Sequence, residues 1–76
     1  MKETKQGNTI TLMDEERGVG IQFTEGETLQ RYTAALVMAD TDRLNTPEGV
    51  EEVSRIQAEL IEEAAKRHPK EFAEMQ

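Results

Sequence analysis

Two segments near the start of the chain alternate between apolar and polar residues. Residues 9–14 (TITLMD) and 19–24 (VGIQFT) both place an apolar side chain at every second position. A period of two is typical of a strand with one buried face, and both segments are rich in the β-branched and aromatic residues that strands prefer. The shared apolar face consists of Ile10, Leu12, Val19, Ile21 and Phe23.

The two segments are predicted to form an antiparallel hairpin whose register keeps this apolar face together. Pairing Asp14 with Val19 puts every member of the face on one side of the sheet. That register leaves residues 15–18 as a four-residue loop, commonly built on a type I turn. Gly18 ends the loop, where a positive φ is needed. Gly20 lies on the opposite, thinner face, where we expect another group to approach closely.

After the hairpin the apolar spacing becomes helical. Thr28 is predicted to cap a first helix whose apolar positions run to Met38, and the pattern weakens over residues 40–45. Thr46 and Pro47 predict the start of a second helix, with threonine as N-cap and proline in the first helical position. The apolar stripe of this helix consists of Val50, Val53, Ile56, Leu60, Ile61 and Ala64.

The second helix is predicted to end at His68, because Pro69 disfavours helical backbone in the residue before it. The partial negative charge of the helix end stabilises a histidine there, and this is the role we predict for the one histidine of the chain. Catalysis would need a nearby nucleophile, but Ser54 lies about 21 Å away along a straight helix. Phe72 and Met75, three apart, indicate a last helical turn that packs back on the domain.

The predicted fold is α+β: a β-hairpin followed by two helices and a short C-terminal helical turn, ββαα in order. Residues 1–8 are polar and without pattern, and are predicted to be a flexible tail, while residues 9–76 form one small domain. A chain of 76 residues without cysteine buries a marginal core, and a two-stranded sheet with two open edges is marginally stable alone. Both features predict a homodimer in which two hairpins pair into a four-stranded sheet.

The charge balance narrows the classes of partner. Nine basic and sixteen acidic residues give a net charge of −7. Such a surface repels phosphate backbones and anionic lipid, so we expect neither direct nucleic-acid binding nor membrane binding, and a basic protein is the partner that fits. No apolar run is long enough to span a membrane, and the N-terminus lacks the hydrophobic stretch of a signal peptide, so a cytoplasmic protein is expected.

Residues 40–51 resemble a calcium-binding loop between two helices, with acidic residues at the first, third and last positions. Leu44 stands where a further ligand is needed, and Asn45 stands where the loop needs glycine. We therefore favour an acidic linker and keep a divalent-metal site as an alternative. The candidate ligands are Asp40, Asp42, Glu48 and Glu51.

Gly18 and Gly20 also begin a glycine-rich phosphate-binding motif. Phe23 replaces its third glycine, and the motif requires a helix directly after the glycines. We interpret these glycines as part of the hairpin, and we expect no cofactor. Because no pair of reactive residues converges, no enzymatic activity is predicted.

The leading functional hypothesis is a non-enzymatic interaction module, an adaptor or modulator that acts through a surface built by a homodimer. The alternative is an acidic inhibitor of the kind that phages and mobile elements encode, which mimics nucleic acid. Mimicry needs carboxylates that no neighbouring cation neutralises, and the hairpin end meets this condition better than the second helix. The candidate partner-binding residues are Asp14, Glu15, Glu16, Glu25 and Glu27.

Overall fold

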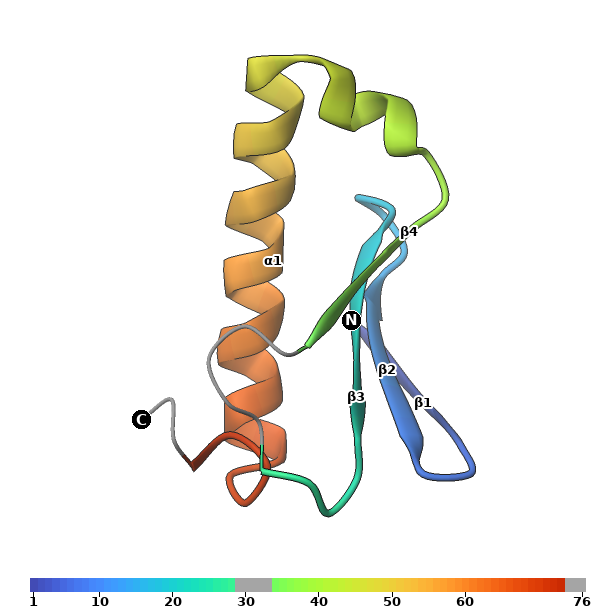
Figure 1. Ribbon diagram of the computed structural model, residues 1–76, viewed down its shortest axis with the longest axis vertical. Helices are drawn as coiled ribbons and strands as arrows, with labels where there is room; N and C mark the ends of the chain where they lie inside the picture. Colours follow the sequence, from blue (N-terminus) through green and yellow to red (C-terminus); the bar gives the residue numbers. More distant parts are fainter. Residues whose placement is uncertain (29–33, 74–76) are drawn as a thin grey trace.

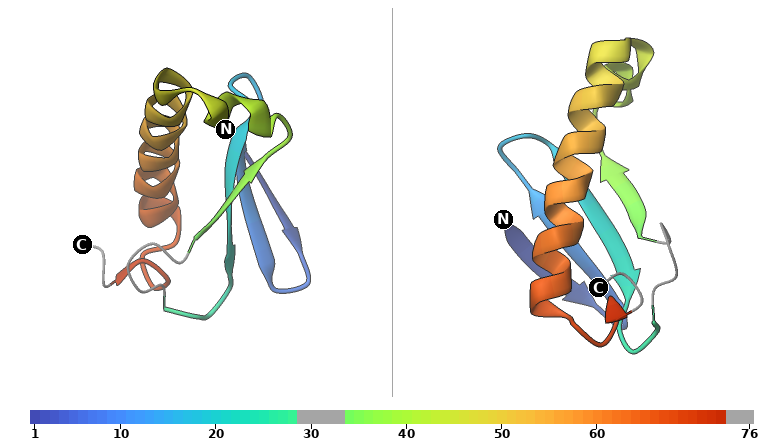
Figure 2. Two further views of the ribbon diagram at one scale, coloured as in Figure 1. Left: turned by 45° about the horizontal axis from the view of Figure 1, so that its top comes forward. Right: turned by 90° about the vertical axis from the view of Figure 1, so that its left-hand side faces the viewer.

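The computed structural model describes residues 1–28 and 34–73, which form one antiparallel sheet and one long helix. In chain order the elements are β1 (Lys2–Gln6), β2 (Thr9–Asp14), β3 (Val19–Thr24), β4 (Ala35–Met38), the 3-10 helix η1 (Thr41–Asn45) and α1 (Pro47–Arg67). The strands lie in the order β1-β2-β3-β4, each antiparallel to its neighbour, and α1 covers one face of the sheet (Figures 1 and 2).

The β2–β3 hairpin has the predicted register. Asp14 pairs with Val19, and the backbone N–H of Gly18 donates to the carbonyl oxygen of Asp14 at 2.8 Å. Gly18 has a φ of 71°, as the turn requires. All five residues of the predicted apolar face are at most 4% exposed. The period of two along these segments is therefore sufficient to fix the pairing.

The strand β1 lies within residues 1–8, where the sequence predicts a flexible tail. All five of its residues are exposed, so no apolar face marks it as a strand. It forms because its backbone pairs with the edge of β2 and because Gly7 and Asn8 close a two-residue turn, with Gly7 at a φ of 60°. Glu3 adds a contact with the end of α1, where its Oε1 lies 2.9 Å from Nε2 of His68.

Of the two predicted helices, the prediction of the first is wrong for the residues that the structure describes. Residues 29–33 lie outside the described part of the chain, and Ala35–Met38 form β4 instead of a helix. By its spacing alone a short apolar run fits either state, and here the second edge of β3 decides, with Val37 opposite Gly20. The α+β class holds, but the order is four strands, a 3-10 helix and one α-helix, and ββαα is wrong.

Both edges of the predicted hairpin are thus covered within one chain. β1 pairs with β2, and β4 pairs with β3. The four-stranded sheet expected from two paired chains is built by a single chain. Any pairing between two copies has to use the new edge strands, β1 and β4.

The helix α1 begins as predicted. The side chain of Thr46 accepts a hydrogen bond from the backbone N–H of Gly49 at 3.0 Å, and Pro47 is the first helical residue. Val50, which its spacing places in the apolar stripe, is 43% exposed and lies outside the core. The buried residues of α1 are Val53, Ile56, Leu60 and Ala64. Among the described residues, no helix combines the length and apolar composition that crossing a bilayer requires.

The chain returns to the core after α1 ends at Arg67. His68 is the C-cap, and its ring lies edge-on to that of Phe23, with 5.2 Å between centroids. Phe72 is 0% exposed, and its ring also lies edge-on to that of Phe23, with 5.1 Å between centroids. The prediction that Phe72 packs back on the domain is confirmed, while Met75 lies outside the described residues.

Glu71 connects this C-terminal turn to the loop after β3. Its Oε2 accepts a hydrogen bond from the backbone N–H of Gly26 at 2.8 Å, and the residue is 8% exposed. The hydrogen bond favours the charged carboxylate and so lowers the pKa of Glu71 below its ordinary value of 4.5.

Because the folded-state pKa of Glu71 is depressed, its stabilising effect is complete above the unfolded-state pKa and is lost as the pH falls through the folded-state pKa. We expect Glu71→Gln to lower the free energy of unfolding at neutral pH, and this difference from the parent to narrow in acid. Urea unfolding followed by circular dichroism, from about pH 7 to about pH 3, measures the difference. Glu62→Gln, which removes an exposed charge from α1, is the control. A difference that stayed constant with pH would contradict the role of the Glu71 carboxylate.

Candidate functional site

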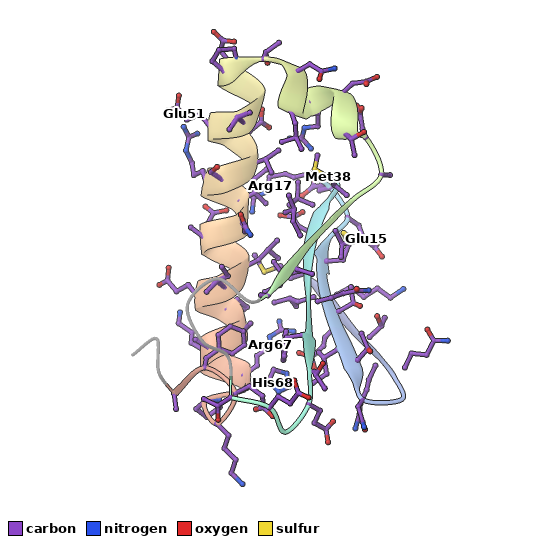
Figure 3. All side chains as sticks on the ribbon, viewed as in Figure 1. Glu15, Arg17, Met38, Glu51, Arg67 and His68 are labelled. Atoms are coloured by element: carbon purple, nitrogen blue, oxygen red, sulfur yellow. The ribbon has the colours of Figure 1, made fainter. Side chains whose placement is uncertain are left out.

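Arg17 joins the tip of the β2–β3 hairpin to α1. Its Nε lies 2.6 Å from Oδ2 of Asp14, and its Nη1 lies 2.5 Å from Oε2 of Glu59. Figure 3 shows Arg17 between the sheet and the helix. The side-chain hydrogen bond from Arg17 holds the pKa of Asp14 below its ordinary value, and the bonds to Asp14 and Glu59 raise the pKa of Arg17.

Arg43 connects η1 to the hairpin tip and to α1. Its Nη1 donates to the carbonyl oxygen of Arg17, and its Nη2 lies 2.8 Å from Oε1 of Glu52 on α1. The contacts of two arginine side chains therefore connect the hairpin tip, η1 and α1. These contacts hold the hairpin tip, η1 and α1 in position relative to one another. The charges of Asp14 and Arg17 at the hairpin tip are part of them.

The five predicted partner-binding carboxylates lie at two opposite ends of the sheet. Asp14, Glu15 and Glu16 are at the hairpin tip, whereas Glu25 and Glu27 follow the far end of β3 (Figure 1). Six residues of strand separate the two groups by about 20 Å. The structure brings the first three together and places the other two elsewhere, so these residues do not form one site.

Cations already pair with most of these carboxylates. The ion pairs are Asp14–Arg17, Glu15–Lys2 and Glu25–Lys5. Along α1 the same kind of pairing recurs, in Glu51–Arg55, Glu52–Arg43, Glu59–Arg17 and Glu63–Arg67. A nucleic-acid mimic gains affinity from charge that is not compensated, so this distribution does not favour mimicry.

The four candidate metal ligands do not converge. Asp40 caps η1, where its Oδ1 accepts from the backbone N–H of Asp42 at 3.1 Å. Glu48 lies in the first turn of α1, and Oε1 of Glu51 lies 3.4 Å from Nη2 of Arg55. In residues 1–28 and 34–73, no group of three or more acidic or histidine side chains is placed to hold a metal ion. The geometry therefore gives the calcium hypothesis no support.

A shallow cleft of about 430 Å³ lies between the hairpin tip and the first half of α1. Its lining residues are Arg17, Glu48, Glu51, Glu52, Arg55 and Ile56. Both arginines and two of the three glutamates already form ion pairs. The cleft therefore has little free charge with which to hold an ionic ligand.

The face of the sheet turned away from α1, here termed the outer face, is almost free of charge. Side chains alternate along a strand, so this face receives three residues from each of β1, β2 and β3 and two from β4, eleven in all. They are Lys2, Thr4, Gln6, Thr9, Thr11, Met13, Gly20, Gln22, Thr24, Ala35 and Val37. Only Lys2 is charged, in a chain of which 33% of residues are charged.

Side chains of neighbouring strands contact one another across the outer face. Nε2 of Gln22 donates to Oγ1 of Thr11 at 3.1 Å. The side chain of Met13 lies over Gly20, where a β-carbon would come within 2.9 Å of the Met13 sulfur. This is the close approach that the sequence predicts at Gly20, and Val37 lies opposite Gly20 on the next strand. An apolar row thus crosses three strands, bordered by threonine and glutamine.

The alternating residues of β2 and β3 predict their part of the outer face, whereas the residues of β1 and β4 carry no such pattern. For β1, the available signal is Gly7-Asn8 between two extended segments, because such a pair is typical of a two-residue hairpin turn. For β4, Val37 offers only the weak strand preference of one β-branched residue.

Function has to be inferred from these surfaces and contacts. Neither models of protein families, nor curated proteins, nor solved structures show a match to this chain.

Proposed function

We propose that the protein is a non-enzymatic protein-interaction module that works as a homo-oligomer and binds its partner through the outer face. The observation that carries the proposal is the composition of this face, where ten of eleven residues are uncharged. The centres of protein interfaces are depleted in charged residues, and methionine is enriched there. A face with an apolar row and a threonine and glutamine border has this character.

The charge distribution also indicates what kind of partner fits. The partner surface that fits the outer face is uncharged and able to exchange hydrogen bonds with threonine and glutamine. The whole chain has a net charge of −7, and in residues 1–28 and 34–73 all of the charged residues except Lys2 lie outside the outer face. This net charge repels acidic proteins and attracts a partner whose rim is basic.

The positions of the reactive side chains support a non-enzymatic role. His68 packs against Phe23, and its Nε2 lies beside the carboxylate of Glu3. Ser54 is exposed on α1, about 21 Å from His68 along the helix. His68 and Ser54 therefore lie too far apart to act together as a catalytic pair.

Site-specific photo-crosslinking tests the proposal. A photo-reactive amino acid is placed at Thr4, exposed on the outer face, or at Ser54, exposed on α1, in cells that encode the protein. We expect a discrete covalent adduct from position 4 and none from position 54. Adding Thr11→Lys and Gln22→Lys puts two charges on the outer face and should abolish the adduct. Because these positions lie opposite one another and share a hydrogen bond, the free energy of unfolding should also fall by about 1–2 kcal/mol, and circular dichroism checks that the variant is folded.

Mass spectrometry of the adduct separates a second copy of the chain from a different protein. Adducts of equal yield from both positions, or a discrete adduct from position 54 alone, would contradict the outer face as the binding surface. An adduct from position 4 that survives both lysine substitutions would contradict it as well.

A further inference from the structure

The two edge strands of the sheet differ in how they are protected. β1 carries Lys2, Glu3 and Lys5, and each of these has an oppositely charged neighbour. Charged side chains on an edge strand discourage the addition of another strand. β4, with the sequence ALVM, has no charged residue.

The outer edge of β4 is open to pairing. β4 is the last strand of the sheet, and no strand within the described residues pairs with its far side. Alternate residues of an antiparallel strand turn their N–H and C=O groups away from the neighbour, so this edge presents backbone groups that no other strand of residues 1–28 and 34–73 binds. Ala35 is exposed, and Leu36 is 36% exposed. An uncharged apolar edge of this kind is a site for strand addition.

We propose that two copies of the chain pair antiparallel along β4, about a two-fold axis at Val37, and so form one eight-stranded sheet. This inference rests on the proposed homo-oligomer and specifies how it is built. The axis runs perpendicular to the sheet, which places the two α1 helices on one side and the two outer faces on the other.

The register follows from the two faces of the strand. A two-fold axis perpendicular to the sheet keeps the outer faces of both copies on the same side. Residues directly opposite one another then share a face, so the axis passes through a residue near the middle of β4, Leu36 or Val37. An axis at Val37 places Leu36 of one copy opposite Met38 of the other, so the two apolar residues on the α1 side of β4 cover one another. We therefore place the axis at Val37.

The charge of the chain favours a second copy at this edge. Two chains of −7 repel one another wherever their carboxylates meet. β4 brings no carboxylate into the contact, and a second β4 has the same length and the same lack of charge. Pairing also covers Leu36, one of the exposed large apolar residues of the chain, with Met38.

The small area of the β4 contact predicts a weak dimer. The dimer also joins the two outer faces into one larger surface. Two four-residue strands bury less than the roughly 1,200 Å² of a stable interface, so association should depend on concentration. One outer face is about 19 Å wide and about 20 Å long, which gives roughly 400 Å². Joining two outer faces side by side doubles this area, close to the roughly 800 Å² per partner of a standard interface.

Cysteine cross-linking tests the register, because the chain has no cysteine of its own. Two residues opposite one another across an antiparallel pair have Cα atoms about 4.5–5.5 Å apart, within reach of a disulfide. Val37→Cys should therefore form a covalent dimer under mild oxidation, whereas Ser54→Cys, exposed on α1, should not. A dimer packed outer face to outer face could form the same disulfide, since disulfides join the two packed sheets of β-sandwiches, and sedimentation of the Leu36→Lys variant separates the two arrangements.

Sedimentation velocity tests the edge without a covalent bond. From about 10 µM to about 1 mM, the parent should shift toward twice the 8.6 kDa chain mass. Leu36→Lys gives β4 the kind of charge that protects β1 and should abolish the shift. Leu44→Lys, at a residue of η1 that is 40% exposed, should leave it unchanged.

Each outcome bears on one of the two proposals. A parent that stays monomeric at the highest concentration, or equal disulfide yields from positions 37 and 54, would overturn the edge pairing. A dimer that survives Leu36→Lys but is lost with Thr11→Lys and Gln22→Lys would overturn it in favour of face-to-face packing. The outer-face adduct from position 4 reports on partner binding separately, so failure of the edge pairing is distinguishable from failure of the proposed function.

Discussion

Replacing Phe72 by alanine is expected to lower the free energy of unfolding by about 3–5 kcal/mol. Phe72 is 0% exposed, and its ring lies edge-on to that of Phe23 with 5.1 Å between centroids. Truncation removes this buried ring and leaves a cavity where the C-terminal turn closes over the end of the sheet. A chain of 76 residues has a stability of roughly 4–11 kcal/mol, so the substitution removes a large share of it and, at the low end of this range, leaves the variant close to unfolded at room temperature.

Urea unfolding followed by far-ultraviolet circular dichroism measures this effect, since the chain has no tryptophan. Leu44→Ala provides the comparison, because Leu44 is 40% exposed on η1 and its truncation should cost less than about 1 kcal/mol. A Phe72→Ala variant within about 1 kcal/mol of the parent would show that the C-terminal turn is not part of the core.

Replacing Gly49 by alanine is expected to lower the free energy of unfolding by about 1–3 kcal/mol, against the usual preference of helices for alanine. A β-carbon at this position would lie 1.7 Å from the carbonyl oxygen of Arg43. Two backbone segments cannot absorb such an overlap, so η1 has to move away from the first turn of α1. That movement should also break the hydrogen bond from Arg43 to the hairpin tip.

Ser54→Ala is the control for Gly49→Ala. Ser54 is exposed on the same helix, where alanine should be neutral or slightly stabilising. Amide hydrogen exchange adds a local reading, since protection should fall in residues 41–50 of the Gly49 variant and stay unchanged in the control. A Gly49→Ala variant more stable than the parent would mean that η1 does not press on α1 in solution.

Periodicity predicted the parts of the fold that carry their own apolar pattern. The β2–β3 register follows from five alternating apolar residues, and the start of α1 follows from Thr46 and Pro47. In both cases the decisive residues are neighbours along the chain or face one another across a short turn. Local physics is sufficient there, because no distant segment has to be known.

The positions of the candidate partner-binding carboxylates in space do not follow from periodicity. The grouping of Asp14 with Glu25 treats carboxylates near the two ends of one strand as a single cluster, and the structure separates them. The pairing of these carboxylates with Arg17 and Lys5 also depends on where the folded chain brings each cation. Charge counts along a sequence do not contain that information.

By itself the sequence determined the central hairpin, the buried face of its strands and the start and C-terminal end of α1. Only the tertiary structure decided the state of the segments with weak patterns. Lys2–Gln6 has no apolar face, and Ala35–Met38 fits helix or strand, yet both become strands because the hairpin offers each an edge of unpaired backbone groups. Backbone hydrogen bonding is available to any non-proline residue, so it leaves no mark in the pattern of side chains. The outer face and the unprotected edge of β4 follow from those two strands and could be identified only in the folded chain.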